Sequence, residues 1–553
     1  MAEGYAPAAR GGWVVHGATS WRDYFKFNTD HKVIGTQYIT MGFIFFLIGG
    51  LMAEAIRAQL SRPGNTLITG NLYNELFSLH GTIMIFLWVI PVLTGVANFI
   101  VPLQIGAQDM AFPKLNALSL WLAVLGGLLM LASFVVGGAE SGWSAYPPLS
   151  EQTGNGQTLW ALALFVIGFS SIFGGLNFLV TIMNLRAPGM TLMRLPLFSW
   201  SMIATSIIIL GGTPVLAAAL ALMLWDRVVG THFFSATGDP LMWQNLFWFY
   251  SHPAVYIMIL PGFGIISEVL PVFARKPIFG YKMIAFSSMA IAIFGFLVWA
   301  HHMFTSGMNP LLRIPFMLTS MIIAVPTGVK IFSWLATIWG GRIRFTTSML
   351  FALSFIAMFV IGGLSGIFLA SIPIDIDVQD SYFVVAHLHY VLFGGTVQAV
   401  FAGLYFWFPK ITGRMLNERL GKIHFWITFI GFNLTFLPQH WLGLEGMPRR
   451  VFTYPPEFAT ANLISSIGAF VLGIAVLPFL ANILISLRAG KLAGANPWRS
   501  LTLEWTLPSP PPIHNFPQLP VVISDPYGYG RKQSAQPAQP QPTSRPAPTG
   551  GGQ

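Results

Sequence analysis

The chain has 553 residues, of which 54% are hydrophobic and 9% charged, and its formal net charge is +10. A soluble domain carries about 25% charged residues, so this composition excludes a soluble globular protein and indicates an integral membrane protein. Cysteine is absent, which excludes disulfides, iron–sulfur clusters, covalently attached c-type haem and thiolate copper centres in this chain. The basic residues are scattered through short loops and form no stripe, so the charge does not indicate nucleic-acid binding.

Apolar runs of about 20 residues, long enough to cross a bilayer as a helix, recur along the chain. They predict an all-α integral membrane protein with twelve transmembrane helices in one bundle, because the connections between the runs are short. The runs lie at 33–56, 73–101, 115–137, 158–183, 197–224, 242–270, 283–307, 315–338, 347–371, 382–408, 422–442 and 462–487.

Three regions follow from these runs. We expect an N-terminal segment over 1–32, the twelve-helix domain over 33–488 and a C-terminal extension over 489–553. The N-terminal segment lacks a short apolar core before a small-residue cleavage site, so it predicts no signal peptide. The last part of the extension, Gln533 to Gln553, is rich in proline and glutamine and has the composition of a disordered tail.

Charged residues in the loops predict the orientation of the bundle. If the N-terminus lies inside, the inner loops carry about twice as many lysines and arginines as the outer loops, and acidic residues such as Asp375 and Asp377 collect outside. Basic residues favour the cytoplasmic side. The sequence therefore predicts a multi-pass protein whose N-terminus is cytoplasmic.

Six histidines lie inside the apolar runs, at His80, His252, His301, His302, His387 and His389. An ionisable side chain at membrane depth is a functional-site hypothesis by default, although a single one can be satisfied by a backbone carbonyl or a water-filled cavity. Six imidazoles with no thiolate and few carboxylates beside them suit haem iron and copper.

His387 and His389 are two residues apart on one predicted helix. Their side chains leave opposite sides of the backbone, about 200° apart, so we expect them to have two different partners. His252 and Tyr256 stand at i and i+4 and share a helix face.

The motifs around these histidines resemble subunit I of haem–copper terminal oxidases over about 30–488, which covers all twelve helices. The matching stretches are long and specific. They are Phe77-Ser78-Leu79-His80-Gly81, His252-Pro253-Ala254-Val255-Tyr256, Trp299-Ala300-His301-His302-Met303-Phe304, Pro326-Thr327-Gly328-Val329-Lys330, Val385-Ala386-His387-Leu388-His389-Tyr390-Val391 and Gly446-Met447-Pro448-Arg449-Arg450.

The resemblance implies a metal ligand set. His80 and His389 would be the axial ligands of a low-spin haem, and His387 would hold a high-spin haem from one side. Copper would be held by His252, His301 and His302.

Other residues match the surroundings of these groups in the family. Tyr256 matches a tyrosine covalently linked to the copper ligand, and Arg57 matches a contact to the ring substituent of the low-spin haem. The pair Arg449 and Arg450 matches the residues that neutralise haem propionates.

Two proton paths are implied by the same resemblance. Lys330, with Thr327 and Ser267, matches a lysine-lined path toward Tyr256. A second path begins at the loop residue Asp109 and is lined by two asparagines, Asn98 and Asn116.

The chain departs from the common family pattern at two places. Ala254 occupies the position of a glutamate at the top of the second path, and Tyr250 and Ser251 precede His252, as in the branch in which a Tyr-Ser pair replaces that glutamate. Gln379 beside Asp380 stands where relatives have a histidine–aspartate pair at a magnesium site, so Asp380 is a candidate magnesium ligand.

The resemblance implies a cytochrome c oxidase core subunit of a bacterial-type inner membrane, which reduces oxygen to water and pumps protons. Its cofactors would be two haems, expected to be haem A, and one copper ion. Its partners would be a subunit II with a dinuclear copper centre, a subunit III, small membrane subunits, a c-type cytochrome donor and the lipid bilayer.

Three other protein classes fit the sequence less well. A quinol oxidase shares the scaffold, but Ile48, Met52, Leu72 and Glu75 occupy the positions of its known quinone-binding residues. A nitric oxide reductase usually lacks the tyrosine at the position of Tyr256. A many-helix transporter would explain the hydropathy but not the six histidines.

Overall fold

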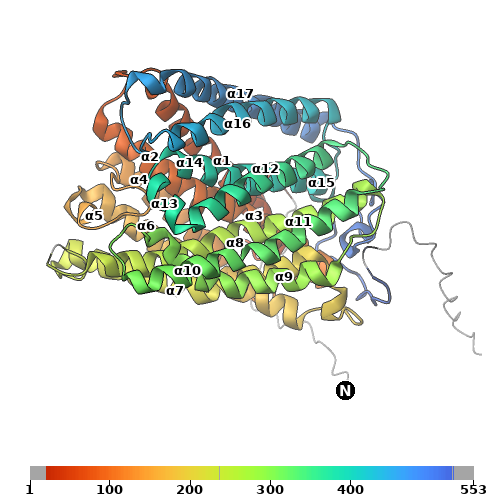
Figure 1. Ribbon diagram of the computed structural model, residues 1–553. Helices are drawn as coiled ribbons and strands as arrows, with labels where there is room; N and C mark the ends of the chain where they lie inside the picture. Colours follow the sequence, from red (N-terminus) through yellow and green to blue (C-terminus); the bar gives the residue numbers. More distant parts are fainter. Residues whose placement is uncertain (1–19, 236, 526, 528–553) are drawn as a thin grey trace, which may run out of the picture.

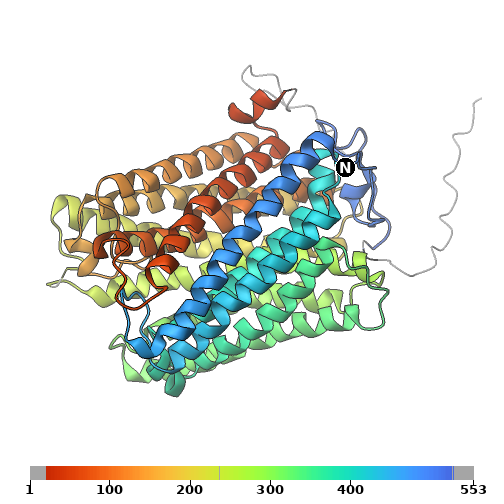
Figure 2. The same ribbon diagram turned by 90° about the horizontal axis from the view of Figure 1, so that it is seen from above.

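The computed structural model describes residues 20–235, 237–525 and 527. Within them, twelve long apolar helical segments pack together in one bundle (Figures 1 and 2). They are His31–Gln59, Gly70–Ile105, Pro113–Val135, Asn155–Asn184, Leu197–Val229, Pro240–Ala274, Tyr281–Met303, Pro310–Ile338, Thr347–Ala370, Tyr382–Thr412, Glu418–Leu444 and Pro456–Ala489. Each predicted run overlaps one of these segments, so the prediction of an all-α, twelve-helix protein is confirmed.

Most of the segments are single α-helices. They are α1 (His31–Gln59), α4 (Pro113–Val135), α6 (Asn155–Asn184), α7 (Leu197–Val229), α8 (Pro240–Ala274), α12 (Thr347–Ala370), α16 (Glu418–Leu444) and α17 (Ala459–Ala489). Short helices α5 (Leu149–Gln152) and α13 (Ile372–Val378) lie in the loops.

Four segments are interrupted along their length, three of them by a change of helix type. A π-helical turn, Met84–Val89, joins α2 (Gly70–Ile83) to α3 (Ile90–Ile105), and another, Leu392–Val397, joins α14 (Tyr382–Val391) to α15 (Gln398–Thr412). The helix α9 (Tyr281–Phe294) continues in two 3₁₀ turns, Gly295–Leu297 and Trp299–Met303, and α10 (Pro310–Ile322) is followed by α11 (Ala324–Ile338). These interruptions matter because π turns and 3₁₀ stretches inside helices often occur at functional sites.

The helix α8 lies at the centre of the bundle. Its most hydrophobic 18-residue stretch is 100% buried, compared with 28% for α1 and 22% for the last segment. Other helices cover this stretch, since α8 packs against α7, α15 and α11. Nearer the start of α8, His252 is buried and Tyr256 is half-buried.

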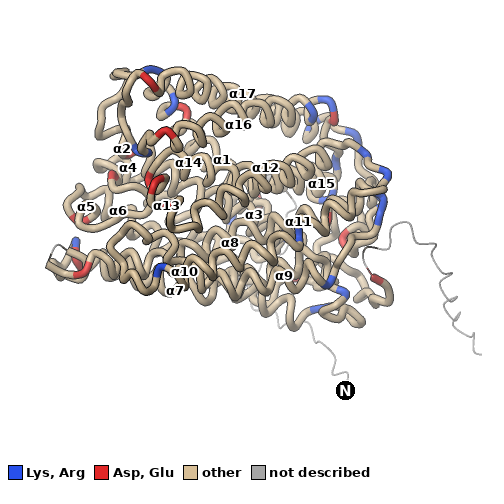
Figure 3. The backbone as a smooth tube through the Cα atoms, in the orientation of Figure 1, with Lys and Arg blue, Asp and Glu red and all other residues tan. Residues whose placement is uncertain are grey.

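Charge divides the two ends of the bundle. Lysines and arginines gather at one end, and most aspartates and glutamates lie toward the other (Figure 3). The C-terminal extension folds across the basic end, where α1 begins. It is fastened there by Lys410, whose buried Nζ atom donates to the carbonyl of Leu507 at 2.6 Å and to that of Ala495 at 3.0 Å. The predicted tail over 533–553 lies outside the described residues.

Candidate metal centre and the polar paths around it

Three histidines from two segments converge on one point. One ring nitrogen each of His252 on α8 and of His301 and His302 in the 3₁₀ turn lies within 4.8 Å of the others, and this is the only group of three metal-ligating side chains of this kind in the described residues. The rings of His252 and His301 are 4.4 Å apart between centroids, at 88° to each other. Imidazole rings at such an angle can point one nitrogen lone pair each at the same metal ion.

The 3₁₀ turn, which the sequence did not predict, places the two adjacent histidines. Successive residues are separated by about 120° in a 3₁₀-helix and by about 100° in an α-helix. Each ring also has its own support, because His301 Nδ1 lies 2.8 Å from Ser320 Oγ of α10 and the ring of His302 stacks on Trp248 at 3.8 Å. These contacts fix ring orientation before any metal binds.

His387 lies on α14 and is held by the neighbouring helix α12. Its Nδ1 atom donates to the carbonyl oxygen of Gly362 at 3.0 Å and lies 3.1 Å from Ser365 Oγ. A Cβ atom at Gly366 would come within 2.9 Å of His387 Cε1, so the glycine is required for this close approach. With Nδ1 bound, Nε2 is the atom that can ligate a metal.

His80 and His389 form a facing pair. Their rings are nearly parallel, at 13°, with 6.4 Å between centroids. His80 Nδ1 donates to the carbonyl of Gly49 at 2.8 Å, and His389 Nδ1 donates to that of Val385 at 2.8 Å. Since a histidine nitrogen binds a metal at about 2 Å, this spacing suits one metal atom between two Nε2 atoms.

Tyr256 lies beside the three converging histidines. Its ring is 4.8 Å from that of His252 between centroids, as the i, i+4 spacing predicted. The backbone of Gly295 closes the other side, because a Cβ atom there would lie 3.0 Å from Tyr256 Cδ2.

Arg57 is buried at the end of α1, with 6% of its surface exposed. Its Nη2 atom donates to the carbonyl of Asn462 at 2.8 Å and to Ser466 Oγ at 2.9 Å. Its Nε and Nη1 atoms are buried and have no hydrogen-bond partner in the described part of the chain. Because unsatisfied buried donors are costly, these atoms suit an acceptor on a bound group.

The two arginines after α16, which match the family's propionate-neutralising pair, differ in their surroundings. Arg449 is half-buried and forms an ion pair with Asp380, with its Nε atom donating to Asp380 Oδ1 at 2.7 Å. Arg450 is exposed. Asp380 thus has a cationic partner already, and the neighbouring carboxyl of Asp375 is buried, which together with the charge of Asp380 raises its pKa to about 7.

Lys330 is fully buried on α11, so its side chain does not extend to the membrane surface. It also has no direct hydrogen bond to Thr327 or Ser267, its predicted path partners, among the described residues. Its Nζ atom donates to Ser288 Oγ at 2.6 Å and to the carbonyl of Ile284 at 2.8 Å, both on α9. Ser267 instead accepts from Trp334 Nε1 at 3.0 Å, and the hydroxyl of Thr327 donates to the carbonyl of Ile323.

The structure brings the two predicted asparagines of the second path into contact. Asn116 Nδ2 donates to Asn98 Oδ1 at 2.7 Å. Asp109 lies in the loop between α3 and α4, where burial raises the pKa of its carboxyl to about 7, offset in part by the backbone N–H of Met110. A carboxyl with that pKa exchanges protons readily near neutral pH.

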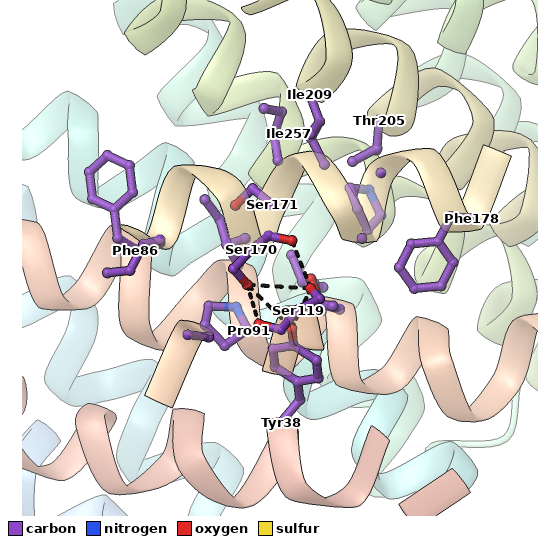
Figure 4. A pocket seen from close by; sticks show the side chains of 18 of the residues that line it. Tyr38, Phe86, Pro91, Ser119, Ser170, Ser171, Phe178, Thr205, Ile209 and Ile257 are labelled. Atoms are coloured by element: carbon purple, nitrogen blue, oxygen red, sulfur yellow. Dashed lines mark hydrogen bonds between the residues drawn. The ribbon is translucent and has the colours of Figure 1, made fainter. Parts of the chain in front are cut away.

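Beyond the asparagine pair lies a polar cluster that the sequence analysis missed. Tyr38, Ser119 and Ser170, from α1, α4 and α6, are linked by hydrogen bonds, with Tyr38 Oη 2.8 Å from Ser119 Oγ (Figure 4). They line a cavity of about 40 Å³, room for a few waters at roughly 10–15 Å³ each. Hydroxyl residues in otherwise apolar runs were the signal available in the sequence.

The cavity ends near the substituted glutamate position. Its lining includes Phe86 and Ile257, and the ring of Phe86 stacks on Tyr250 at 6.3 Å. Tyr250 is buried, and the buried Oγ atom of Ser251 has no hydrogen-bond partner among described residues. Tyr250 therefore contacts a residue of the cavity lining, and Ser251 is the residue next to His252.

The donor sets fit the groups that the sequence implied. The converging imidazoles suit copper, and His252 Nε2 is buried with no hydrogen-bond partner in the described residues. His387 and the pair His80 and His389 leave the nitrogens needed for one five-coordinate and one six-coordinate haem iron.

Comparison with known proteins agrees with this geometry. Residues 33–471 match the family described as "Cytochrome C and Quinol oxidase polypeptide I". The chain is 58% identical to cytochrome c oxidase subunit 1 of Thermostichus vulcanus over 93% of this chain and 94% of the relative. It is 49% identical to the same subunit of Bacillus subtilis, over 92% and 82%.

A solved structure supports the fold independently. The chain superimposes on a heme-copper terminal oxidase dimer structure with a TM-score of 0.70 and 20% identity, over 84% of this chain and 85% of that one. Taken with the sequence matches, and with the three imidazoles that meet at one point, these findings show that the chain belongs to the cytochrome c oxidase subunit 1 family, the catalytic core of haem–copper oxygen reductases.

Proposed function

We propose that this chain couples the reduction of oxygen to proton pumping, with the ligand assignment that the family motifs imply. The observation that carries the proposal is the convergence of His252, His301 and His302 beside Tyr256. When bound, the haems and copper supply the electron transfer and the metal orbitals for oxygen reduction. The protein supplies ligand identity, ring orientation and a closed site.

His389 and His387 divide the two haems between the two sides of α14. In this assignment His80 and His389 hold the low-spin haem, and His387 holds the high-spin haem. A reduced-minus-oxidised spectrum of the purified enzyme, with and without carbon monoxide, tests the assignment. A spectrum with only low-spin haem, or with only high-spin haem, would contradict the assignment.

Tyr256 provides a proton and an electron from its hydroxyl during oxygen reduction. The contact between the rings of Tyr256 and His252 supports this role, and also supports the covalent link that the family carries. Mass spectrometry of a proteolytic digest would detect the link as one crosslinked peptide.

Protons reach the centre along two paths in our proposal. The first runs past Ser267, Thr327 and Lys330 toward Tyr256. The second enters at Asp109 and continues through the asparagine pair and the cavity of Tyr38 and Ser119. Waters must bridge its gaps, because within the described part of the chain no continuous series of direct hydrogen bonds joins these groups.

The second path ends at Tyr250 and Ser251 in place of a glutamate, which assigns the chain to the Tyr-Ser branch of the family. The short distance between the cavity lining and Tyr250 supports this end point. A tyrosine hydroxyl relays protons but holds negative charge less readily than a carboxylate.

We propose two haems A and one copper ion as the cofactors, and Asp380 as a candidate magnesium ligand that would exchange its ion pair with Arg449 for the metal. The unpartnered Nε and Nη1 atoms of Arg57 support a haem with a polar ring substituent such as a formyl oxygen. Haem extraction and elemental analysis test both points. Haem O in the extract, or less than one magnesium per enzyme, would contradict the respective assignment.

A second subunit must carry the dinuclear copper centre, because this chain has no cysteine. We propose that it assembles with such a subunit II, a subunit III and small membrane subunits, and that a c-type cytochrome donates electrons. The rival donor is a quinol, for which Ile48, Met52, Leu72 and Glu75 offer no matching site. Oxygen uptake driven by reduced cytochrome c but not by quinol would support the assignment.

The basic end of the bundle faces the cytoplasm in this proposal, so the N-terminus is cytoplasmic in a bacterial-type inner membrane. The asymmetry in Figure 3 supports this orientation. Protease accessibility of the C-terminal tail in inside-out and right-side-out vesicles would test it.

A further inference from the structure

The C-terminal extension contributes one buried side chain to the loop that carries Asp109. Asn515 is 0% exposed, although its neighbours Ile513, His514 and Pro517 are exposed. Its backbone has φ +56, the left-handed region that asparagine tolerates better than most residues. The side chain of Asn515 therefore enters the bundle from a segment that otherwise lies on the surface.

The amide nitrogen of Asn515 binds the loop directly. Its Nδ2 atom has two hydrogens, and one of them is shared between the carbonyl oxygens of Ala107 at 2.9 Å and Gln108 at 3.1 Å, the two residues before Asp109. Because α3 ends at Ile105, these two carbonyl oxygens lie beyond the helix and need hydrogen-bond donors from elsewhere. Asn515 thus completes the backbone hydrogen bonding of the loop.

The same amide also connects, through His31, to the backbone of Asn98 in the second path. His31 Nδ1 lies 2.7 Å from the carbonyl of Asn98 and must donate to it, so Nε2 of neutral His31 is an acceptor. Asn515 Nδ2 supplies that hydrogen bond at 2.8 Å. Asn515 Oδ1 accepts from Lys32 Nζ at 3.0 Å.

We propose that Asn515 is a positioning residue for proton uptake, which holds the loop of Asp109 against the helix turn of Asn98. The inference rests on the proposed second path and adds a residue from a distant part of the chain to its entrance. It follows that the C-terminal extension is part of the proton-uptake machinery rather than only a cover over the bundle.

Release of the loop changes the surroundings of the Asp109 carboxyl. The charged groups that act on it are Asp30, which raises its pKa, and Lys32, which lowers it, while the backbone N–H of His31 also lowers it by hydrogen bonding; all three residues lie at the start of α1. Burial raises the pKa of Asp109 to about 7, so a loosened, hydrated loop would lower it. The proton occupancy of Asp109 near neutral pH would then fall.

Two variants separate the side chain from the backbone. Asn515→Gly removes the amide and keeps a residue that adopts positive φ. Asn515→Asp keeps the shape and the oxygen that binds Lys32, but places an oxygen where Nδ2 donates. Gln518→Gly is the matched control, because Gln518 is exposed in the same segment.

The experiment uses the complete purified oxidase, with haem and copper contents measured first. In both Asn515 variants we expect amide hydrogen exchange over 106–112 to become about tenfold faster, as a buried hydrogen bond is lost. We also expect slower proton uptake, followed with a pH dye during oxidation of the reduced enzyme, and a turnover profile displaced to lower pH. Gln518→Gly should match the parent in all three measurements.

Two results would overturn the inference. One is unchanged exchange over 106–112, and the other is faster exchange with parental proton uptake and pH profile. Asp109→Asn tests the second path separately from the role of Asn515. Normal uptake in Asp109→Asn would overturn the second path itself, whereas impaired uptake in Asp109→Asn with normal uptake in Asn515→Gly would overturn only the role of Asn515.

Discussion

His387 and His389 are anchored through the same ring atom to different helices. His387 Nδ1 donates to the carbonyl of Gly362 on α12, whereas His389 Nδ1 donates to that of Val385, one turn earlier on its own helix. The opposite facing of the two side chains is local to α14, but the orientation of His387 depends on a neighbour. The two histidines should therefore respond differently to changes outside α14.

Removal of each ring tests the ligand assignment. We expect His387→Ala to lose the high-spin haem signal and to retain a six-coordinate low-spin spectrum. The matched variant His389→Ala should lose the low-spin signal, because its partner His80 cannot complete six-coordination alone. Optical spectra of the reduced enzyme, with carbon monoxide added, distinguish the two. Loss of the low-spin band in His387→Ala would reverse the assignment.

Gly366 offers a test of the support from α12. A Cβ atom at Gly366 would meet His387 Cε1 at 2.9 Å, whereas one at Gly363 would meet nothing within 4 Å. We expect Gly366→Ala to displace the ring, weaken the high-spin signal and destabilise the protein by about 1–3 kcal/mol, the usual cost of overpacking. Gly363→Ala is the control and should keep the parental spectrum and thermal stability. Equal behaviour of the two variants would argue against this contact.

Tyr256→Phe should keep both haem signals and the copper but lose oxygen reduction, because the redox-active hydroxyl is removed. The ring is retained, so its packing against Gly295 and His252 should survive. Oxygen uptake with a reduced cytochrome donor measures the effect, and turnover near the parental value would exclude the proposed role.

The raised pKa of Asp109 also predicts a pH-dependent stability. Its folded value of about 7 exceeds the ordinary value of about 3.9, so the folded state binds the proton more tightly than the unfolded state. Stability is then lost as pH rises from about 4 to 7. We expect Asp109→Asn to gain thermal stability relative to the parent at pH 8 but not at pH 4. An equal difference at both values would show that this carboxyl has an ordinary pKa.

The substituted glutamate gives a test of the end of the second path. Tyr250→Phe should slow proton delivery with metal content unchanged, because it removes a hydroxyl and keeps the ring that stacks on Phe86. Ala254→Glu in the same background restores a carboxylate one turn away, and we expect it to recover turnover and pumping in part. Oxygen uptake and proton ejection in vesicles compare the parent, Tyr250→Phe and the double variant. Full pumping by Tyr250→Phe alone would contradict the Tyr-Ser reading.

Sequence reasoning was strongest where chemistry is local to one helix. The apolar runs predicted every long helix, because a segment in lipid must satisfy its backbone internally. The i, i+4 spacing predicted the contact between His252 and Tyr256, and the two-residue spacing predicted the opposite facing of His387 and His389.

The polar residues of the paths could be predicted only in part. Lys330 and Asp109 stand out as charges in or beside apolar runs, but their partners did not follow from spacing. Lys330 binds Ser288 of α9 rather than Thr327 or Ser267. Hydrogen bonds between helices depend on which helix faces pack together. The spacing of residues within one helix does not reveal this.

By itself, the sequence determined the membrane class, the helix count, the metal-ligating residue types and the absence of a thiolate copper site. Only the tertiary structure decided that three imidazoles meet at one point, that α12 orients His387, and that Asn515 reaches back to His31 over 484 positions. The physical reason is the range of the forces involved. Hydropathy and helix periodicity act along the chain, whereas ligand convergence and buried hydrogen bonds require helices remote in sequence to pack together.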